Sequence, residues 1–88
     1  MITKLNNFLV GEVTHYYDKI GVAIVELSSD LAVGDKINLV RGGEDLFEQV
    51  VESIQIEHSK VPSAKKGDVI GLKTTESVKE GAKIYKKQ

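Results

Sequence analysis

The sequence predicts an all-β domain, namely a small closed six-stranded antiparallel β-barrel. Val and Ile number 19 of the 88 residues, against 11 for Leu and Ala, and β-branched residues favour sheets. Short apolar runs recur every 8–14 residues, with glycine-containing turns between them. Closure of such a sheet into a barrel would remove the exposed strand edges.

The length of the chain allows one domain, residues 1–88, with an ordered core of about 8–86, a short N-terminal lead and a lysine-rich C-terminal end. Cysteine is absent, so packing alone must supply the stability. No apolar run approaches the roughly 18 residues that cross a bilayer, and residues 1–7 lack the apolar centre of a signal peptide. These features predict a cytoplasmic protein.

The first two strands are expected at Leu9–Thr14 and Gly21–Leu27. Between them, Tyr17–Gly21 forms a turn, since Asp and Gly tolerate the backbone angles of a hairpin. The second strand is almost continuously apolar. This is typical of a strand that is buried on both faces, or on one face of a closed barrel.

The third strand is expected between Val33 and Val40, and a turn follows at Arg41–Asp45. The next segment, residues 46–54, allows two interpretations. Its apolar residues lie at helical spacing, but a strand with a bulge at Val50–Val51 explains them equally well. The β-branched run that continues to Ile56 favours the strand.

The remaining strands are expected around Ile54–Ile56, at Val69–Lys73 and at Lys83–Lys86. Three strand entrances have a similar sequence, with Gly34, Gly67 and Gly81 at positions that call for a positive φ. Asp35 and Asp68 follow the first two glycines. We expect each to accept hydrogen bonds from nearby backbone amides rather than to form a carboxylate pair.

The core predicted from these strands consists of alternating and clustered aliphatic residues. Its members are Val22, Ile24, Val25, Ile37, Leu39, Ile54, Ile56, Val69, Ile70 and Ile84.

Charge is distributed unevenly along the chain. Residues 1–59 have a net charge of −6 and residues 60–88 a net charge of +5. Such an asymmetry either marks a basic binding surface or only keeps the surface solvated. The candidate contacts to RNA or to a protein partner are four lysines and a tyrosine that could stack on a base, namely Lys65, Lys66, Lys86, Lys87 and Tyr85.

No catalytic or metal-binding motif is present. His15 and His58 have no closely spaced partner ligand, and no serine has the surroundings of an activated nucleophile. The sequence therefore predicts a protein that is not an enzyme and that binds no metal, nucleotide or other cofactor.

Several motifs resemble a known family. The runs 53–58 and 64–72, together with Val33–Leu39 and Gly11–Val13, resemble domain 2 of translational GTPases of the elongation factor Tu/1A type. The likeness is closer still to small proteins described as translation elongation factor-like, and to a similar barrel at the C-terminus of collagenase-like peptidases. His15–Tyr17 and Ser53–Gln55 carry that last likeness.

The resemblance implies a six-stranded closed β-barrel and a non-catalytic module that engages RNA or a translation component. It places Gln55 where the family has a glutamate that meets the terminal ribose of transfer RNA. No Gly-x-x-x-x-Gly-Lys-Ser/Thr motif occurs, so this chain alone is not expected to hydrolyse GTP. The alternative is a protein-interaction barrel that docks on a separate enzyme or factor.

Overall fold

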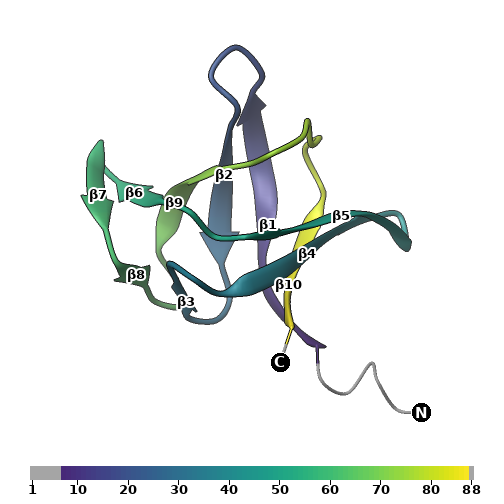
Figure 1. Cartoon of the computed structure of the whole chain (residues 1–88), viewed down its shortest axis with the longest axis horizontal. Helices are drawn as coiled ribbons and strands as arrows, with labels where there is room; N and C mark the ends of the chain where they lie inside the picture. The colour runs from purple at the N-terminus through teal and green to yellow at the C-terminus, as the bar shows by residue number, and fades with distance from the viewer. Residues whose placement is uncertain (1–6, 88) are drawn as a thin grey trace.

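The structure, a computed structural model, describes residues 7–87, with side chains for residues 9–86, and it is built from strands, turns and loops (Figure 1). The strands are β1 (Asn7–Tyr17), β2 (Val22–Leu27), β3 (Leu31–Ala32), β4 (Lys36–Arg41), β5 (Glu44–Val50), β6 (Ile54–Ile56), β7 (Ser59–Val61), β8 (Ser63–Ala64), β9 (Val69–Lys73) and β10 (Lys83–Lys87). Within this part of the chain, no helix is long and apolar enough to cross a membrane.

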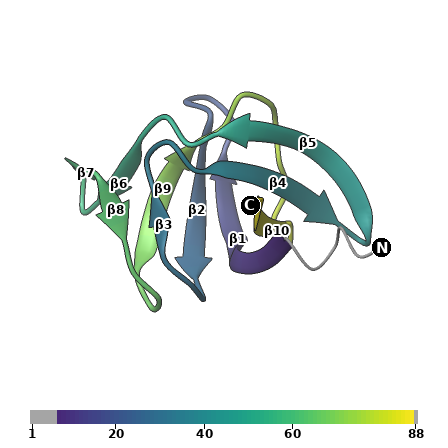
Figure 2. The same cartoon turned by 60° about the horizontal axis from the view of Figure 1, so that its bottom comes forward.

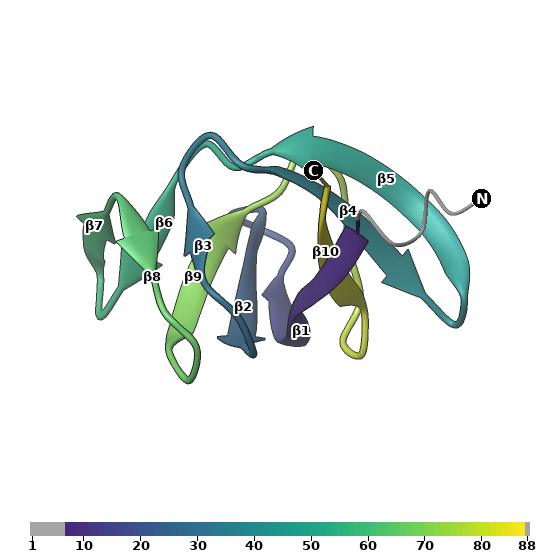
Figure 3. The ribbon, with the colours of Figure 1, turned by 90° about the horizontal axis from the view of Figure 1, so that it is seen from below.

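Eight of the strands form one antiparallel sheet, in the order β5–β4–β10–β1–β2–β9–β6–β7, and β3 pairs with β8 separately. The large sheet is strongly curved, so that β4 and β5 arch across the sheet over β1 and β10 (Figure 2, Figure 3). The prediction of an all-β antiparallel domain is confirmed.

The ambiguous segment is a strand. β5 runs from Glu44 to Val50 and pairs with β4, and β6 begins at Ile54. The change of phase that the sequence shows near Val50–Val51 is therefore a break of three residues, 51–53, between two strands. A helix would need the buried residues on one side at a period of 3.6, whereas Gln49 and Val51 are buried on either side of an exposed Val50.

The long strand β1 bends at two irregularities, where its register shifts between Leu9 and Gly11 and again between Val13 and His15. Extra residues of this kind increase the local bend and twist of a strand. Gly11 lies at the first bend, against β2. A Cβ atom there would lie 2.6 Å from the carbonyl oxygen of Glu26 and 2.8 Å from Cγ1 of Val25. Only glycine allows the two strands to approach so closely.

The core lies on the concave side of the sheet, and part of the predicted set belongs to it. The buried aliphatic residues are Val10, Val13, Ala23, Val25, Leu27, Leu31, Ile37, Leu39, Val51, Ile54, Ala64, Ile70, Leu72, Val78, Ala82 and Ile84. Val22, Ile24 and Ile56 are only half-buried, and Val69 is 55% exposed.

Of the two arrangements expected for β2, burial on both faces is excluded and burial on one face is observed. Its buried residues, Ala23, Val25 and Leu27, alternate with Val22 and Ile24, which face outward. The same alternation in β9 buries Ile70 and leaves the neighbouring Val69 outside. An apolar run does not reveal which of its two sets of residues faces the core.

The three strand entrances form the same type of turn. Gly34, Gly67 and Gly81 have φ of 97°, 93° and 90°. A glycine with positive φ at the third position is the mark of a type II turn. The Oδ2 atoms of Asp35 and Asp68 each accept a hydrogen bond of 2.9 Å, from the backbone amides of Ala32 and Lys65. The predicted positive φ and the turn-closing role of both aspartates are confirmed.

Gln49 links β5 to the far end of β9. Its side chain is only 7% exposed. Nε2 donates to the carbonyl oxygen of Lys73 at 2.9 Å, and Oε1 accepts from the backbone amide of Thr75 at 2.8 Å. β5 and β9 are not neighbours in the sheet, so this one amide satisfies backbone groups across the concave side.

Replacing Gly11 with Ala should lower the free energy of unfolding by about 1–3 kcal/mol, because the new methyl group overlaps the β2 backbone. Urea denaturation measures the loss. Gly71→Ala is the matched control, since a Cβ there has its nearest contact at 3.4 Å, in the ordinary range. Equal stability of the two variants would mean that β1 and β2 are farther apart than described.

Replacing Gln49 with Ala should destabilise the fold by about 2–4 kcal/mol, since two backbone groups lose their partners in a buried position. Hydrogen exchange at the Thr75 amide should accelerate together with the loss of stability. Gln55→Ala removes the same amide from a partly exposed position on β6 and should cost much less. A Thr75 amide that exchanges at the parental rate in Gln49→Ala would contradict the link.

Candidate binding surface

The predicted contact residues lie at separate places in the fold. Lys65 and Lys66 lie in the turn between β8 and β9, where the backbone amide of Lys66 donates to Oδ1 of Asp30 at 3.3 Å. Gln55 lies on β6, on the other side of β9 from β2. The lysine turn and Gln55 therefore contribute to different surfaces.

Tyr85 and Lys86 lie on β10, which is separated from β6 by β1, β2 and β9. The Nζ atom of Lys86 is 3.3 Å from Oδ2 of Asp35, so its charge is already paired within the domain. The side chain of Lys87 lies outside the described residues. The structure does not bring the candidate lysines, Tyr85 and Gln55 together into one patch. As contacts to a protein partner they stay a prediction.

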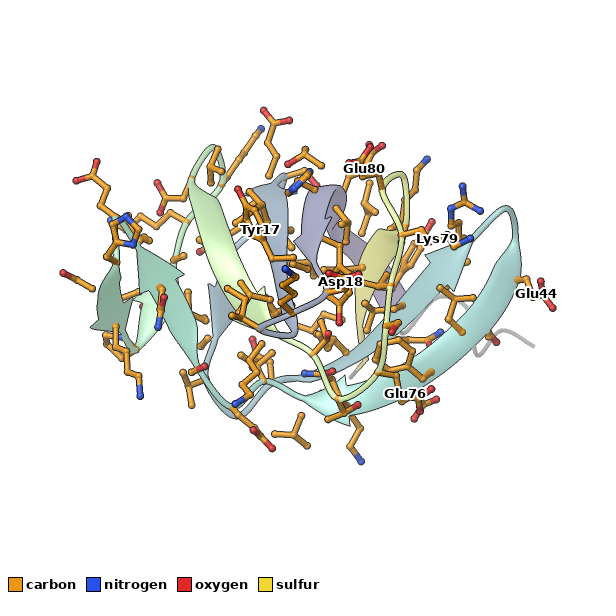
Figure 4. All side chains as sticks on the ribbon, turned by 90° about the horizontal axis from the view of Figure 1, so that it is seen from above. Tyr17, Asp18, Glu44, Glu76, Lys79 and Glu80 are labelled. Carbon is orange, nitrogen blue, oxygen red and sulfur yellow. The ribbon has the colours of Figure 1, made fainter. Side chains whose placement is uncertain are left out.

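The two histidines occupy different surfaces. His15 Nδ1 is 3.0 Å from Oε2 of Glu80, and its ring packs edge-on against Tyr17. Figure 4 shows Tyr17 and Asp18 at the end of β1, beside the connection that carries Lys79 and Glu80. His58 lies in the β6–β7 turn. Among residues 7–87, no three His, Cys, Asp or Glu side chains are grouped as metal ligands.

An apolar surface that the sequence did not reveal lies on the outward faces of β1, β2, β9 and β6. The registers of these strands place Tyr17 beside Val22, Val22 beside Lys73, Ile24 beside Gly71, and Gly71 beside Gln55. All of these residues are exposed or half-buried, because the alternate residues of each strand fill the core. Ile20, 64% exposed in the β1–β2 turn, extends the surface.

Two adjoining hollows of about 290 and 200 Å³ run across this surface, and we call them together the outer groove. The larger hollow is lined by Tyr17, Ile20, Val22, Ile24, Gln55, Glu57, His58, Val69, Ile70 and Gly71. The smaller shares Ile20, Val22, Gln55 and Gly71 with it and adds Ser53, Lys60 and Lys73. An apolar hollow with a few polar groups at its margin is the usual form of a binding site.

The charges at the outer groove are segregated. Lys60 and Lys73 line the smaller hollow, and Glu57 lines the larger one. Glu26 pairs with Val69 in the β2–β9 register, so it stands at the same end as Glu57. Along β9, the outward positions run Lys73, Gly71, Val69, a span of about 13 Å at the usual rise per residue.

Glu57 and His58 form the two-residue turn between β6 and β7, with positive φ of 52° and 70°. A turn with two positive φ angles favours Asn-Gly. Residues held in this sparsely populated region are often found at functional sites. Both residues line the outer groove, so the unfavourable turn and the apolar hollow coincide.

Comparison with known proteins identifies proteases as relatives. The chain is 39% identical over 83 residues to an uncharacterized protease of Methanocaldococcus jannaschii. The matched segment covers 94% of this chain and 20% of that protease. It is also 33% identical over 78 residues to a collagenase of Porphyromonas gingivalis. This matched segment covers 88% of the chain and 22% of the collagenase. The chain thus spans about a fifth of the length of these relatives. No family model matches the chain.

The fold is that of solved domains from another peptidase. A C-terminal domain of a Geobacillus thermoleovorans protein assigned to the U32 peptidases matches with a TM-score of 0.82 and 21% identity, over 90% of this chain and 91% of that domain. The selenomethionine variant of the domain matches with a TM-score of 0.81 and 20% identity, over 88% of this chain and 96% of that one.

The relatives overturn the prediction of a translation factor-like module. They are proteases and the C-terminal domain of a peptidase, in agreement with the other likeness, to the barrel of collagenase-like peptidases. The expected engagement of RNA or a translation component is wrong for the same reason, and the role of Gln55 that the translation-factor resemblance implied loses its basis. The motifs behind that expectation form turns and strand starts, such as those at Gly34 and Gly67, which specify a fold but no activity.

Replacing His58 with Gly should raise the free energy of unfolding by about 0.5–1 kcal/mol, because glycine adopts its φ of 70° without strain. Thermal and urea denaturation measure the gain. Ser59→Gly, one residue further in β7, is the control and should be neutral or destabilising, as glycine weakens a strand. A less stable His58→Gly variant would contradict the described turn.

Proposed function

We propose that this chain is a non-catalytic protein-interaction domain that docks on a peptidase. The observation that carries the proposal is the 39% identity to one fifth of a protease, a segment long enough to form this domain but not the whole enzyme. The match to an isolated C-terminal domain of a U32-type peptidase supports the same assignment. Domains within one chain meet through interfaces like those of transient complexes, so a separate chain of this fold can use the same kind of contact.

The side chains support a binding role rather than catalysis. A hydrolase needs a nucleophile with an adjacent base, or a metal centre that activates water. In the described part of the chain, His15 pairs with Glu80 on an exposed surface, and no serine or threonine hydroxyl is hydrogen-bonded to either histidine. The described side chains thus offer surfaces for contact but no grouping of this catalytic kind.

We also propose that the curved sheet functions as a closed six-stranded barrel, in which β5 and β6 act as one bent strand. Only residues 51–53 separate these two strands, although β5 pairs with β4 at one end of the sheet and β6 pairs with β9 near the other. The Gln49 amide also joins β5 to the end of β9. Such a closed form would present a rigid outer face to a partner.

The docking proposal predicts binding to a peptidase that lacks its own domain of this kind. The test mixes the 88-residue chain with the M. jannaschii protease from which the matching segment has been deleted, and follows the titration by calorimetry. We expect a Kd in the micromolar range, as for transient interfaces of modest size.

The intact protease is the matched control. It should bind more weakly, because its own segment occupies the docking site. The chain alone, incubated with casein or gelatin, should release no peptides. Failure to bind the truncated protease would contradict docking, and release of peptides that persists through purification would contradict a non-catalytic role.

A further inference from the structure

We propose that the outer groove binds the carboxyl-terminal end of a short extended peptide, with an apolar last residue. This inference extends the proposed function, because it gives the domain a ligand besides the peptidase on which it docks. It does not depend on docking, since all the residues that carry it belong to this chain. Shape, size and charge each support it.

The shape of the groove depends on Gly71. This residue lies on β9 between Ile24 and Gln55 of the neighbouring strands and faces outward. A Cβ atom placed there would contact Cγ1 of Val22 at 3.4 Å and Cβ of Gln55 at 3.8 Å. The missing side chain therefore leaves a depression, with Val22 and Ile24 on one side, which is large enough for an aliphatic side chain.

The size of the surface limits the occupant. The surface is four strands wide, which is about 14 Å at a spacing of about 4.8 Å. Its length from Lys73 to Val69 along β9 is about 13 Å. A stable complex of two folded proteins buries about 800 Å² on each partner, several times this area. A peptide of three or four residues in an extended conformation spans the same 13 Å. The groove fits such a segment and is too small for a stable interface with a second folded domain.

The basic lining of the smaller hollow calls for a carboxylate. Lys60 and Lys73 line the smaller hollow with the hydroxyl of Ser53 and the amide of Gln55, and none of its lining residues is acidic. Neither lysine is in an ion pair within the described chain. The two hollows share Val22 and Gly71, so an anion in the basic hollow and an apolar side chain in the larger hollow would be neighbours. A C-terminal residue carries both on one Cα atom.

The acidic end complements the other part of the peptide. Glu57 and Glu26 lie near Val69, about 13 Å from Lys73 along β9. An extended tetrapeptide places its amino terminus, or a basic first side chain, at this distance from its carboxylate. Like charges at the wrong ends would disfavour the reverse orientation. The segregated charges thus specify the direction of the chain in the groove.

The probe for the test is the tetrapeptide Lys-Val-Ala-Leu with a free carboxylate, titrated into the isotopically labelled 88-residue protein. We expect shifts of the backbone resonances of Val22, Gln55 and Gly71, with a Kd of micromolar to millimolar. The same peptide with a C-terminal amide should bind about tenfold more weakly, because a charge-assisted contact is lost. Equal affinity of acid and amide would overturn the proposal.

Variants locate the contact. Lys60→Gln with Lys73→Gln should weaken binding of the free acid about tenfold and leave binding of the amide unchanged. Lys36→Gln with Lys83→Gln makes the same change of net charge on β4 and β10, which β1 and β2 separate from β9, and should leave both affinities as they are. These lysines are all exposed, and thermal melts verify that each variant folds. Weaker binding by the control double variant alone would place the peptide site outside the groove.

Two further outcomes would also overturn the proposal. Concentration-dependent dimerisation that shifts the same resonances without peptide would assign the groove to a second copy of the chain. Resonance shifts on adding the truncated protease that coincide with the groove, with no effect of the tetrapeptide, would assign the groove to peptidase docking. Peptide binding without any binding to the protease would support the groove and contradict the docking proposal.

Discussion

The structure depends on the curvature of one antiparallel sheet. The described chain has strands and no helix to cover the sheet, so the core lies within the curve of the sheet itself. The two irregularities in β1 contribute to the bend, and the absence of a side chain at Gly11 allows β1 to lie close against β2. The Gln49 amide then joins β5 to the end of β9 and satisfies backbone groups that no strand ladder reaches.

Curvature also determines what the outside of the domain presents. Strict alternation of side chains means that each β-branched run contributes one set of residues to the core and the other to the surface. In β2 and β9 the outward set includes Val22, Ile24 and Val69, which together with Gly71 form the outer groove. The apolar surface is thus a consequence of strands that have apolar residues at both their inward and their outward positions. The segregated charges at its ends are not required by the fold, and they give the groove a direction.

The likeness to peptidase domains and the absence of a catalytic grouping in the described residues fit together. The matching segment is a fifth of a larger protease, and the proposed binding role leaves the chemistry to a separate part or partner. The motifs that led to a translation factor are turns and strand starts, such as those at Gly34 and Gly67, and these specify a fold but no activity.

The sequence by itself determined the all-β class, the positive φ of Gly34, Gly67 and Gly81, and the turn-closing aspartates, because the turns depend on residues within four positions of one another. For segment 46–54 the sequence favoured a strand but left a helix open, and the structure decided between them. Only the tertiary structure decided which phase of β2 and β9 faces the core, since an apolar run satisfies either one. The role of Gln49, the pairing of Lys86 with Asp35 and the outer groove likewise depend on strand order and register, which join residues that local patterns cannot relate.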